Sequence, residues 1–215
     1  MCYSQGNYRK NKAAYYRAIP VCYISYYVKT GRVKEGISYF EKNEKALFHF
    51  LKYEPFLNQL STYVLSAYLL LIAREFKRGM ACLGRVINNK DAQWKPSSDF
   101  EFVPLFLNLL FHFELGHNDL IPYLATSIYR TIGKKEKVLN AEKIFLSFMK
   151  KIPPKNNSES LTHAFTELKK QLHPLMNVPE EKPFFETIDY MAWIESKLTG
   201  KPMSEVIYDK NDRSR

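Results

Sequence analysis

The sequence has little glycine and no long apolar run. Only 8 of its 215 residues are glycine, which is too few for the many tight turns of a β-sandwich or β-barrel. The longest strongly apolar stretch, Tyr63 to Ala73, is followed at once by Arg74 and Glu75. It is well short of the roughly 20 residues that cross a bilayer. These shortages argue against an all-β fold and against a membrane span, and we expect no membrane partner.

Cysteine is scarce as well. The three cysteines, Cys2, Cys22 and Cys82, are far apart and form no C-x-x-C pair, which argues against a disulfide framework, a zinc site or a redox motif. A reducing compartment fits this usage best, so we expect a cytoplasmic protein. Because Cys22 and Cys82 sit among apolar residues, we expect both to be small buried side chains and not nucleophiles.

The sequence also lacks the motifs of common catalytic and metal sites. It contains no G-x-G-x-x-G, Walker or G-x-S-x-G pattern. The stretch H-F-E-L-G-H differs from H-E-x-x-H because its histidines, His112 and His117, are five residues apart. That spacing places them on different faces of a helix, and we expect Gly116 to end the helix between them. We predict a non-enzymatic protein with no metal and no cofactor.

Apolar residues, in contrast, are abundant. Hydrophobic residues make up 46% of the chain, aromatic residues 15% and charged residues 25%, a composition typical of folded proteins. The spacing of the apolar residues is helical, most clearly at Leu120, Ile121, Leu124, Ile128 and Ile132. Gly133 follows as a natural end for that helix.

Helical segments recur in pairs along the chain. The pattern predicts helices over Ala13 to Lys29, Arg32 to Tyr53, Phe56 to Phe76, Lys77 to Asn88, Phe102 to Leu115, Leu120 to Ile132, Lys137 to Lys151, Ser158 to His173 and Phe184 to Leu198. A proline-rich connector, interpreted as a linker, runs through Pro174, Pro179 and Pro183. We therefore predict an all-α protein with no strand.

Three regions follow from this pattern. We expect a helical-hairpin repeat region over residues 1–152, where the helix pairs recur. We expect residues 153–208 to form carboxy-terminal helices that pack on the repeats. The polar residues 209–215 are predicted to be a disordered tail.

A degenerate pattern occurs three times in the hairpins. The segment YYVKTGRVKEGISYF has an aromatic residue, a turn glycine, a small residue and a large apolar residue at Tyr27, Gly31, Gly36 and Phe40. The segments REFKRGMACLGRVI and FELGHNDLIPYLATSIY carry looser copies. This pattern resembles that of tetratricopeptide repeats, in which the small residue lies early in the second helix of each hairpin.

The spacing of the copies departs from that family. Gly36 and Gly79 are 43 residues apart, and Gly79 and Ile121 are 42 apart, whereas the tetratricopeptide repeat has about 34 residues. The longer period is similar to that of HEAT repeats. The resemblance thus implies stacked helical hairpins in an irregular α-solenoid, similar to both the tetratricopeptide (TPR) and HEAT families.

Solenoids of this kind bind partners on a concave surface. The resemblance therefore implies a scaffold for another protein or peptide, with binding residues on the first helices of the hairpins. The candidates are Tyr23, Tyr27, Tyr68, Asn108 and His112. Because no polar capping helix precedes the first hairpin, we also hypothesise that the chain is the carboxy-terminal part of a longer solenoid or docks through its beginning.

Charge is distributed unevenly along the chain. Residues 1–34 contain no Asp or Glu, seven of the 15 tyrosines, and seven basic residues that include Arg9, Lys10, Lys12, Arg17 and Arg32. Cations with interleaved aromatic rings favour single-stranded nucleic acid, so nucleic-acid binding by this stretch is the alternative function. Acidic residues gather between Glu180 and Glu195, and this asymmetry is also compatible with self-association.

Overall fold

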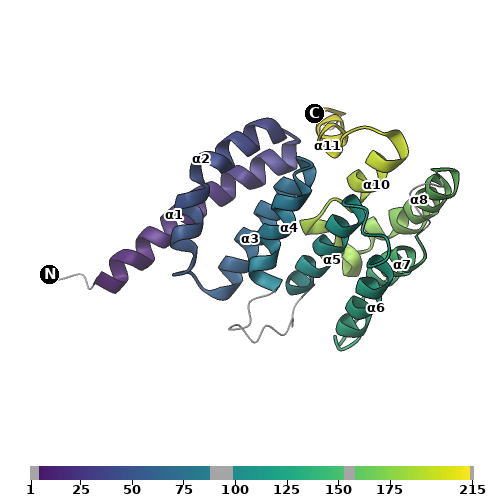
Figure 1. The fold of residues 1–215 in the computed structure, drawn as a ribbon, viewed down its shortest axis with the longest axis horizontal. Coiled ribbons are helices and arrows are strands. Elements are labelled where there is room, and N and C mark those ends of the chain that lie inside the picture. Colours follow the sequence, from purple (N-terminus) through teal and green to yellow (C-terminus); the bar gives the residue numbers. More distant parts are fainter. Residues whose placement is uncertain (1–4, 88–98, 153–157, 214–215) are drawn as a thin grey trace. The chain divides into compact units, whose positions relative to one another are not determined.

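The computed structural model describes residues 5–87, 99–152 and 158–213, without the side chains of residues 5–11, 13 and 99. Within these ranges the regular elements are eleven α-helices and two short 3₁₀ helices, with no strand (Figure 1). The all-α prediction is confirmed. No helix among these residues combines the length and the apolar character that a bilayer crossing needs.

The helices form two compact units that divide the chain differently from the prediction. Unit 1 contains residues 1–88 and 207–215, and unit 2 contains residues 89–206. The predicted boundary after residue 152 falls inside unit 2. The reason lies in the aromatic core of unit 2, described below, which joins helices from both sides of that boundary.

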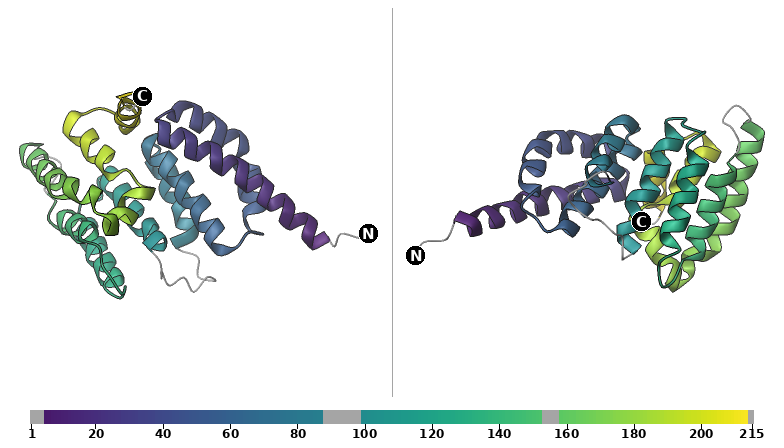
Figure 2. Two further views of the ribbon diagram at one scale, coloured as in Figure 1. Left: turned by 180° about the vertical axis from the view of Figure 1, so that it is seen from behind. Right: turned by 60° about the horizontal axis from the view of Figure 1, so that its bottom comes forward.

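Unit 1 contains two helical hairpins. Its helices are α1 (Gln5–Thr30), α2 (Val33–Leu51), α3 (Phe56–Ile72) and α4 (Phe76–Ile87). Helix α1 packs on α2, α3 packs on α4, and α1 also contacts α3 (Figure 2). Helix α1 begins well before the predicted Ala13, because apolar periodicity marks only the part of a helix that packs on neighbours.

Two glycines shape the first hairpin. Gly31 has a φ of +72°, the left-handed conformation that ends α1 and starts the turn. Gly36 lies where α1, α2 and α3 meet: a Cβ added there would be 2.9 Å from Tyr27 Cβ and 3.0 Å from Leu69 Cδ1. A larger residue at Gly36 would therefore force these helices apart.

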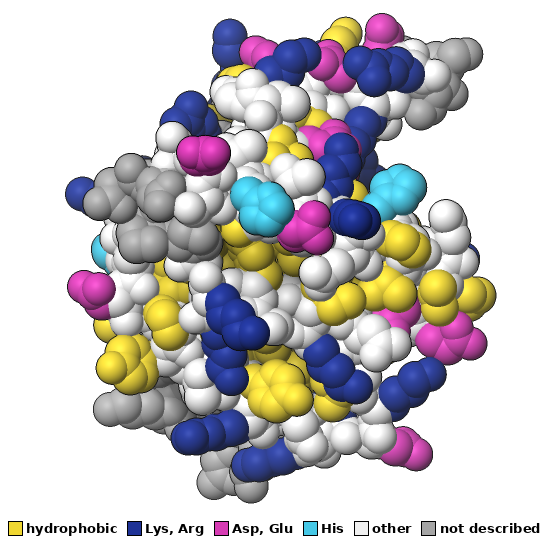
Figure 3. All heavy atoms as spheres, turned by 90° about the vertical axis from the view of Figure 1, so that its right-hand side faces the viewer, with side chains coloured by type: hydrophobic (Ala, Val, Ile, Leu, Met, Phe, Trp, Pro, Cys, Tyr) yellow, Lys and Arg dark blue, Asp and Glu magenta, His cyan; other side chains and the backbone are white. Residues whose placement is uncertain are grey.

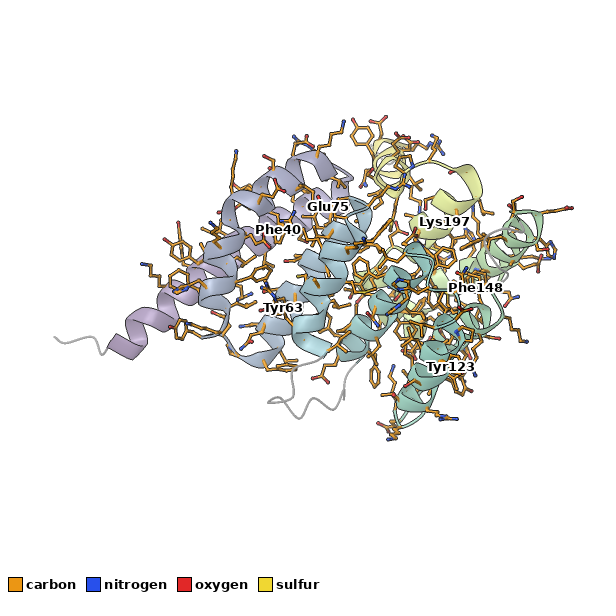
Figure 4. All side chains as sticks on the ribbon, viewed as in Figure 1. Phe40, Tyr63, Glu75, Tyr123, Phe148 and Lys197 are labelled. Atoms are coloured by element: carbon orange, nitrogen blue, oxygen red, sulfur yellow. The ribbon has the colours of Figure 1, made fainter. Side chains whose placement is uncertain are left out.

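Ion pairs tie the hairpins of unit 1 together. Arg17 Nε donates to Glu54 Oε2 at 3.0 Å, and the Glu54 side chain is only 6% exposed. On α4, Arg78 pairs with three carboxylates, those of Glu41, Glu44 and Glu75. Burial disfavours the charged form of Arg78, but the hydrogen bonds to these carboxylates outweigh it and raise its pKa. Figure 4 labels Glu75 and Phe40. The Arg78 guanidinium lies over the ring of Phe40.

The end of the chain is more ordered than predicted. Helix α11 (Met203–Arg213) continues through most of the expected tail. Asn211 Nδ2 donates to the Lys29 carbonyl at 2.7 Å and to the Ile207 carbonyl at 2.8 Å. These bonds link the last turns of α11 to the end of α1 within unit 1. A polar composition alone therefore did not indicate disorder here; residues 214–215 lie outside the described part.

Unit 2 contains the remaining elements. They are α5 (Asp99–Glu114), α6 (Ile121–Ile132), α7 (Asn140–Lys151), α8 (Ser158–Leu172), the 3₁₀ helices η1 (His173–Asn177) and η2 (Pro179–Glu181), α9 (Lys182–Thr187) and α10 (Tyr190–Thr199). Helix α6 packs on both α5 and α7, and α8 packs on α7 and α10. The predicted end of α6 at Gly133 is confirmed.

Aromatic rings form the core of unit 2. The Phe145 ring is fully buried and lies 5.0 Å from the Tyr190 ring, 5.8 Å from Phe184 and 6.0 Å from Phe106 and Trp193. These contacts connect α5, α7, α9 and α10. Because α9 and α10 supply three of these five rings, they belong to the same unit as α5 to α7.

The proline-rich connector is part of the fold and not a free linker. Glu181, in η2, is 3% exposed, and its carboxylate accepts hydrogen bonds from the backbone N–H groups of Asn140 and Ala141 at 3.0 and 2.9 Å. It thus satisfies the free donors at the start of α7, where the helix dipole also favours a negative charge. Helix α7 begins at Asn140, and not at Lys137 as predicted, because these donors are satisfied there.

The predicted helix from Phe184 to Leu198 is divided into α9 and α10. Ile188 between them is extended, with φ −122° and ψ 125°. Asp189 then caps α10, because its carboxylate accepts a hydrogen bond from the Ala192 N–H at 2.7 Å. Helix α10 ends at Thr199, one residue beyond the predicted Leu198, where Gly200 has a φ of +73°.

Candidate functional site

The described residues contain no cluster of metal-ligating side chains. No group of three or more His, Cys, Asp or Glu side chains among them could hold a metal ion. In unit 2 a small recess is lined mostly by apolar side chains, among them Val103, Phe106 and Phe184. The candidate site is instead an exposed surface on α1, in unit 1.

One face of α1 carries large apolar side chains that the described residues leave uncovered. Tyr15 is 62% exposed, Ile19 38%, Tyr23 49% and Tyr26 46%, and Cys22 between them is also exposed. Their spacing of four, three or one residues puts all five on one side of the helix. We call this set, Tyr15, Ile19, Cys22, Tyr23 and Tyr26, the α1 stripe.

The opposite side of α1 is the one that faces the core. Ile24 and Val28 are 0% and 5% exposed, and Pro20 is buried. These residues repeat every four positions and lie about half a turn away from the α1 stripe. Helix α1 is therefore apolar on two opposite faces, a pattern typical of helices that are covered on both sides.

The tyrosines of the α1 stripe are held in place by neighbouring rings. The Tyr23 ring lies 4.9 Å from that of Tyr39 on α2 and 6.5 Å from that of Tyr27, and the Tyr26 ring lies 5.5 Å from Tyr27. Burial, and then the nearby Tyr23 and Tyr27 hydroxyls, raise the pKa of Tyr39. Contacting rings lose rotamer freedom before any partner arrives, which lowers the entropy cost of binding.

The five predicted partner-binding residues are divided between the two units. Tyr23 and Tyr27 are neighbours on α1, as described. Tyr68 is 3% exposed and belongs to the core of unit 1, because α3 is covered on nearly all sides; as a surface residue it was predicted wrongly. Asn108 and His112 are half-buried on α5, in unit 2.

His112 and His117 lie together, contrary to the expectation that they occupy different faces. Their Nδ1 atoms are 3.0 Å apart. Gly116 has a φ of +77°, and the His117 N–H donates to the His112 carbonyl, so the chain folds back over the last turn of α5. Burial, and then the charge of His117, lower the pKa of His112. Two nitrogens at this spacing form a contact at a helix end and not a full set of metal ligands.

The cations predicted to bind nucleic acid are engaged within the protein where their side chains are described. Lys12 Nζ lies 5.7 Å from the centre of the Tyr16 ring and 5.6 Å from that of Phe50. Arg17 pairs with Glu54 as described above. Arg32 donates to Glu35 Oε1 at 3.0 Å and to the Tyr26 hydroxyl at 3.1 Å. The side chains of Arg9 and Lys10 lie outside the described part.

The two described cysteines differ in exposure. Cys82 is buried as predicted, and burial raises its pKa to about 12. Cys22 is exposed on the α1 stripe, so its predicted burial is wrong. The apolar neighbours of Cys22 in the sequence include the exposed Ile19 and Tyr23, which is why composition alone misplaced it.

Thiol labelling should distinguish these cysteines. In a Cys2→Ser variant at pH 8, we expect a maleimide to modify Cys22 within minutes and Cys82 only after unfolding, because the thiolate of Cys82 is both buried and disfavoured. Mass spectrometry of peptides from native and urea-unfolded protein measures both sites. Slow labelling of Cys22 in the native protein would show that the α1 stripe is covered.

Sequence reasoning missed Tyr15 and Ile19, although a signal was present. Apolar residues recur on two opposite sides of α1, and only one side can face the α2–α3 layer. A helical-wheel projection would have identified the second side.

Comparison with known proteins adds no family to this description, because no protein-family model, no curated protein and no solved structure matches the chain.

Proposed function

We propose that this chain is a non-enzymatic helical-repeat scaffold that binds another protein in the cytoplasm, with the α1 stripe as its docking site. The observation that carries the proposal is the second apolar face of α1. Four large side chains there are 38% to 62% exposed, and a row of this kind on one helix face marks an interaction surface. Tyrosine is also among the residues that dominate binding energy at interfaces.

The solenoid architecture is part of the same proposal. Two hairpins of unit 1 stack with α1 against α3. The small residue of the tetratricopeptide-like pattern, Gly36, lies against the aromatic residue of the same pattern, Tyr27. Both features support an arrangement in which each hairpin covers an apolar face of the next, so that α1 presents a face for a further helix.

The partner we propose is an amphipathic helix of another protein, with acidic residues beside its apolar stripe. Helix α1 contains five Lys or Arg residues and no Asp or Glu, and among them the exposed Lys29 lies on the side of the α1 stripe. A partner that carries acidic residues would complement this charge. A second copy of α1 would instead bring like charges together, which disfavours self-association through this face.

The exposed thiol of Cys22 provides the test. A benzophenone-maleimide attached to Cys22 in the Cys2→Ser protein would be irradiated in extract of the native host, and cross-linked proteins identified by mass spectrometry. We expect one recurring partner. With that partner purified, we expect its binding to protect Cys22 from maleimide. The double variant Tyr15→Ser/Tyr23→Ser should weaken affinity by about 100-fold, since each interface tyrosine contributes about 1–2 kcal/mol or more.

The matched control is Tyr123→Ser, which removes an exposed tyrosine from unit 2 and should leave affinity unchanged. Equal binding by wild type and the Tyr15→Ser/Tyr23→Ser variant would rule out the α1 stripe as the docking site. Cross-linking of the chain only to itself would show that the α1 stripe binds a second copy of this chain, and not another protein.

A further inference from the structure

The α6–α7 hairpin of unit 2 has an outer surface with an unusual charge. Residues 121–151 contain seven Lys or Arg residues but only two acidic ones, Glu136 and Glu142. Glu142 is buried and pairs with the buried Lys135, at 2.7 Å between Nζ and Oε1. The surface of the hairpin is left with six exposed cations and one carboxylate, that of Glu136.

These cations are not neutralised within the protein. The six are Arg130, Lys134, Lys137, Lys143, Lys150 and Lys151. Among the described residues, none of them lies within ion-pair distance of a carboxylate. Figure 3 shows Lys and Arg side chains gathered on the lower part of one side of the molecule, with few Asp or Glu side chains among them. This contrasts with Arg17 and Arg32 in unit 1, which both contact carboxylates.

Two exposed tyrosines lie among the cations. Tyr123, labelled on α6 in Figure 4, is 77% exposed, and Tyr129 is 45% exposed. Tyr123 and Arg130 are seven residues apart and share one side of α6. Tyr129 lies toward α7, because Lys150 Nζ is 5.2 Å from the centre of its ring. We call the six cations and these two tyrosines the α6–α7 basic face.

We propose that the α6–α7 basic face binds single-stranded nucleic acid. Unpaired cations bind the phosphate backbone with release of counterions, and exposed aromatic rings stack on unpaired bases. An acidic protein would use the cations but has no need of two exposed rings. An anionic membrane would require a larger apolar area, and among the described residues of this hairpin Leu120 is the only large aliphatic side chain that is exposed. The proposed surface lies on the α6–α7 hairpin, and not in the amino-terminal stretch for which the sequence predicted nucleic-acid binding.

The test is fluorescence anisotropy of a labelled oligouridine of about ten nucleotides, within the usual site size, titrated with the full chain at several salt concentrations. We expect binding at low salt that weakens steeply as salt rises. The variant Arg130→Gln/Lys143→Gln/Lys150→Gln should bind at least tenfold more weakly. Its slope of log affinity against log salt should be smaller by about 2, because each lost phosphate contact removes about 0.7.

A second variant tests the aromatic contribution. Tyr123→Ser/Tyr129→Ser keeps every charge, and we expect it to weaken binding by about tenfold or more with an unchanged salt slope. The charge-matched control is Lys42→Gln/Lys45→Gln/Lys77→Gln, which removes three cations from unit 1 and should leave affinity within about twofold of wild type. Circular dichroism would check that each variant is folded.

Several results would overturn the proposal. One is no binding at low salt, and another is an equal loss of affinity in the charge-matched control, which would indicate general attraction to any cationic surface. Unchanged affinity in the tyrosine variant would show that the face binds polyanions through its charges alone, without stacking on bases. Tighter binding to phosphatidylserine vesicles or to polyglutamate than to the oligonucleotide would assign the face to a membrane or to an acidic protein.

Discussion

Phe145→Ala should destabilise unit 2 by about 3–5 kcal/mol, the usual cost of removing a fully buried phenylalanine. The Phe145 ring is 0% exposed and contacts four other rings from α5, α9 and α10. Its loss removes both buried apolar area and the ring–ring contacts that aromatic pairs add. The cavity would lie where α7 meets the carboxy-terminal helices, so the whole unit should be affected.

Urea unfolding followed by Trp193 fluorescence measures this effect. The chain has two tryptophans, and a Trp94→Phe background leaves Trp193, whose ring is 1% exposed in the core of unit 2. The control is Phe185→Ala, which removes a half-buried ring in α9 and should cost about 1 kcal/mol, as for a typical substitution. A loss below about 1.5 kcal/mol for Phe145→Ala would contradict the shared core.

Lys135→Met should have a similarly large effect, because it removes one partner of a buried ion pair. The side chains of Lys135 and Glu142 are 7% and 4% exposed, and Nζ and Oε1 are 2.7 Å apart. The second oxygen of Glu142 accepts the Leu139 N–H at 3.0 Å. After the substitution this carboxylate would be charged, buried and only partly hydrogen-bonded, so we expect a loss of about 3–5 kcal/mol.

The double variant Lys135→Met/Glu142→Gln isolates the contribution of the charge. The introduced amide would keep an acceptor for the Leu139 N–H while the buried charge is removed, so we expect the double variant to be more stable than Lys135→Met alone by about 2 kcal/mol. Urea unfolding at pH 7, applied also to Glu142→Gln alone, measures the whole set. If the two single effects simply add, the pair is not coupled and the buried-charge explanation fails.

Part of the candidate site could be predicted from the sequence. Tyr23 and Tyr27 were identified because they are aromatic residues on the first helix of a predicted hairpin, and such a helix is recognised from a local pattern. Tyr68 was predicted wrongly, since its spacing is helical but the side of α3 on which it lies is covered by other helices. Cys22 shows the converse: its neighbours are apolar, yet its face of α1 is exposed.

The sequence by itself determined where most helices lie. Apolar residues at helical spacing and glycines such as Gly31 and Gly133 act through hydrogen bonds and contacts within about one turn. Such signals are contained in a few consecutive residues. They therefore predicted the all-α class, the hairpins and several helix ends.

Only the tertiary structure decided which helices share a core and which faces stay exposed. Glu181 caps α7 from 40 residues away, Arg17 pairs with Glu54 across 37 residues, and Trp193 donates to Glu114 across 79. No local pattern encodes these contacts, because each depends on how helices distant in the chain pack together. The same packing divides the chain into its two units, and it leaves the α1 stripe and the α6–α7 basic face uncovered among the described residues.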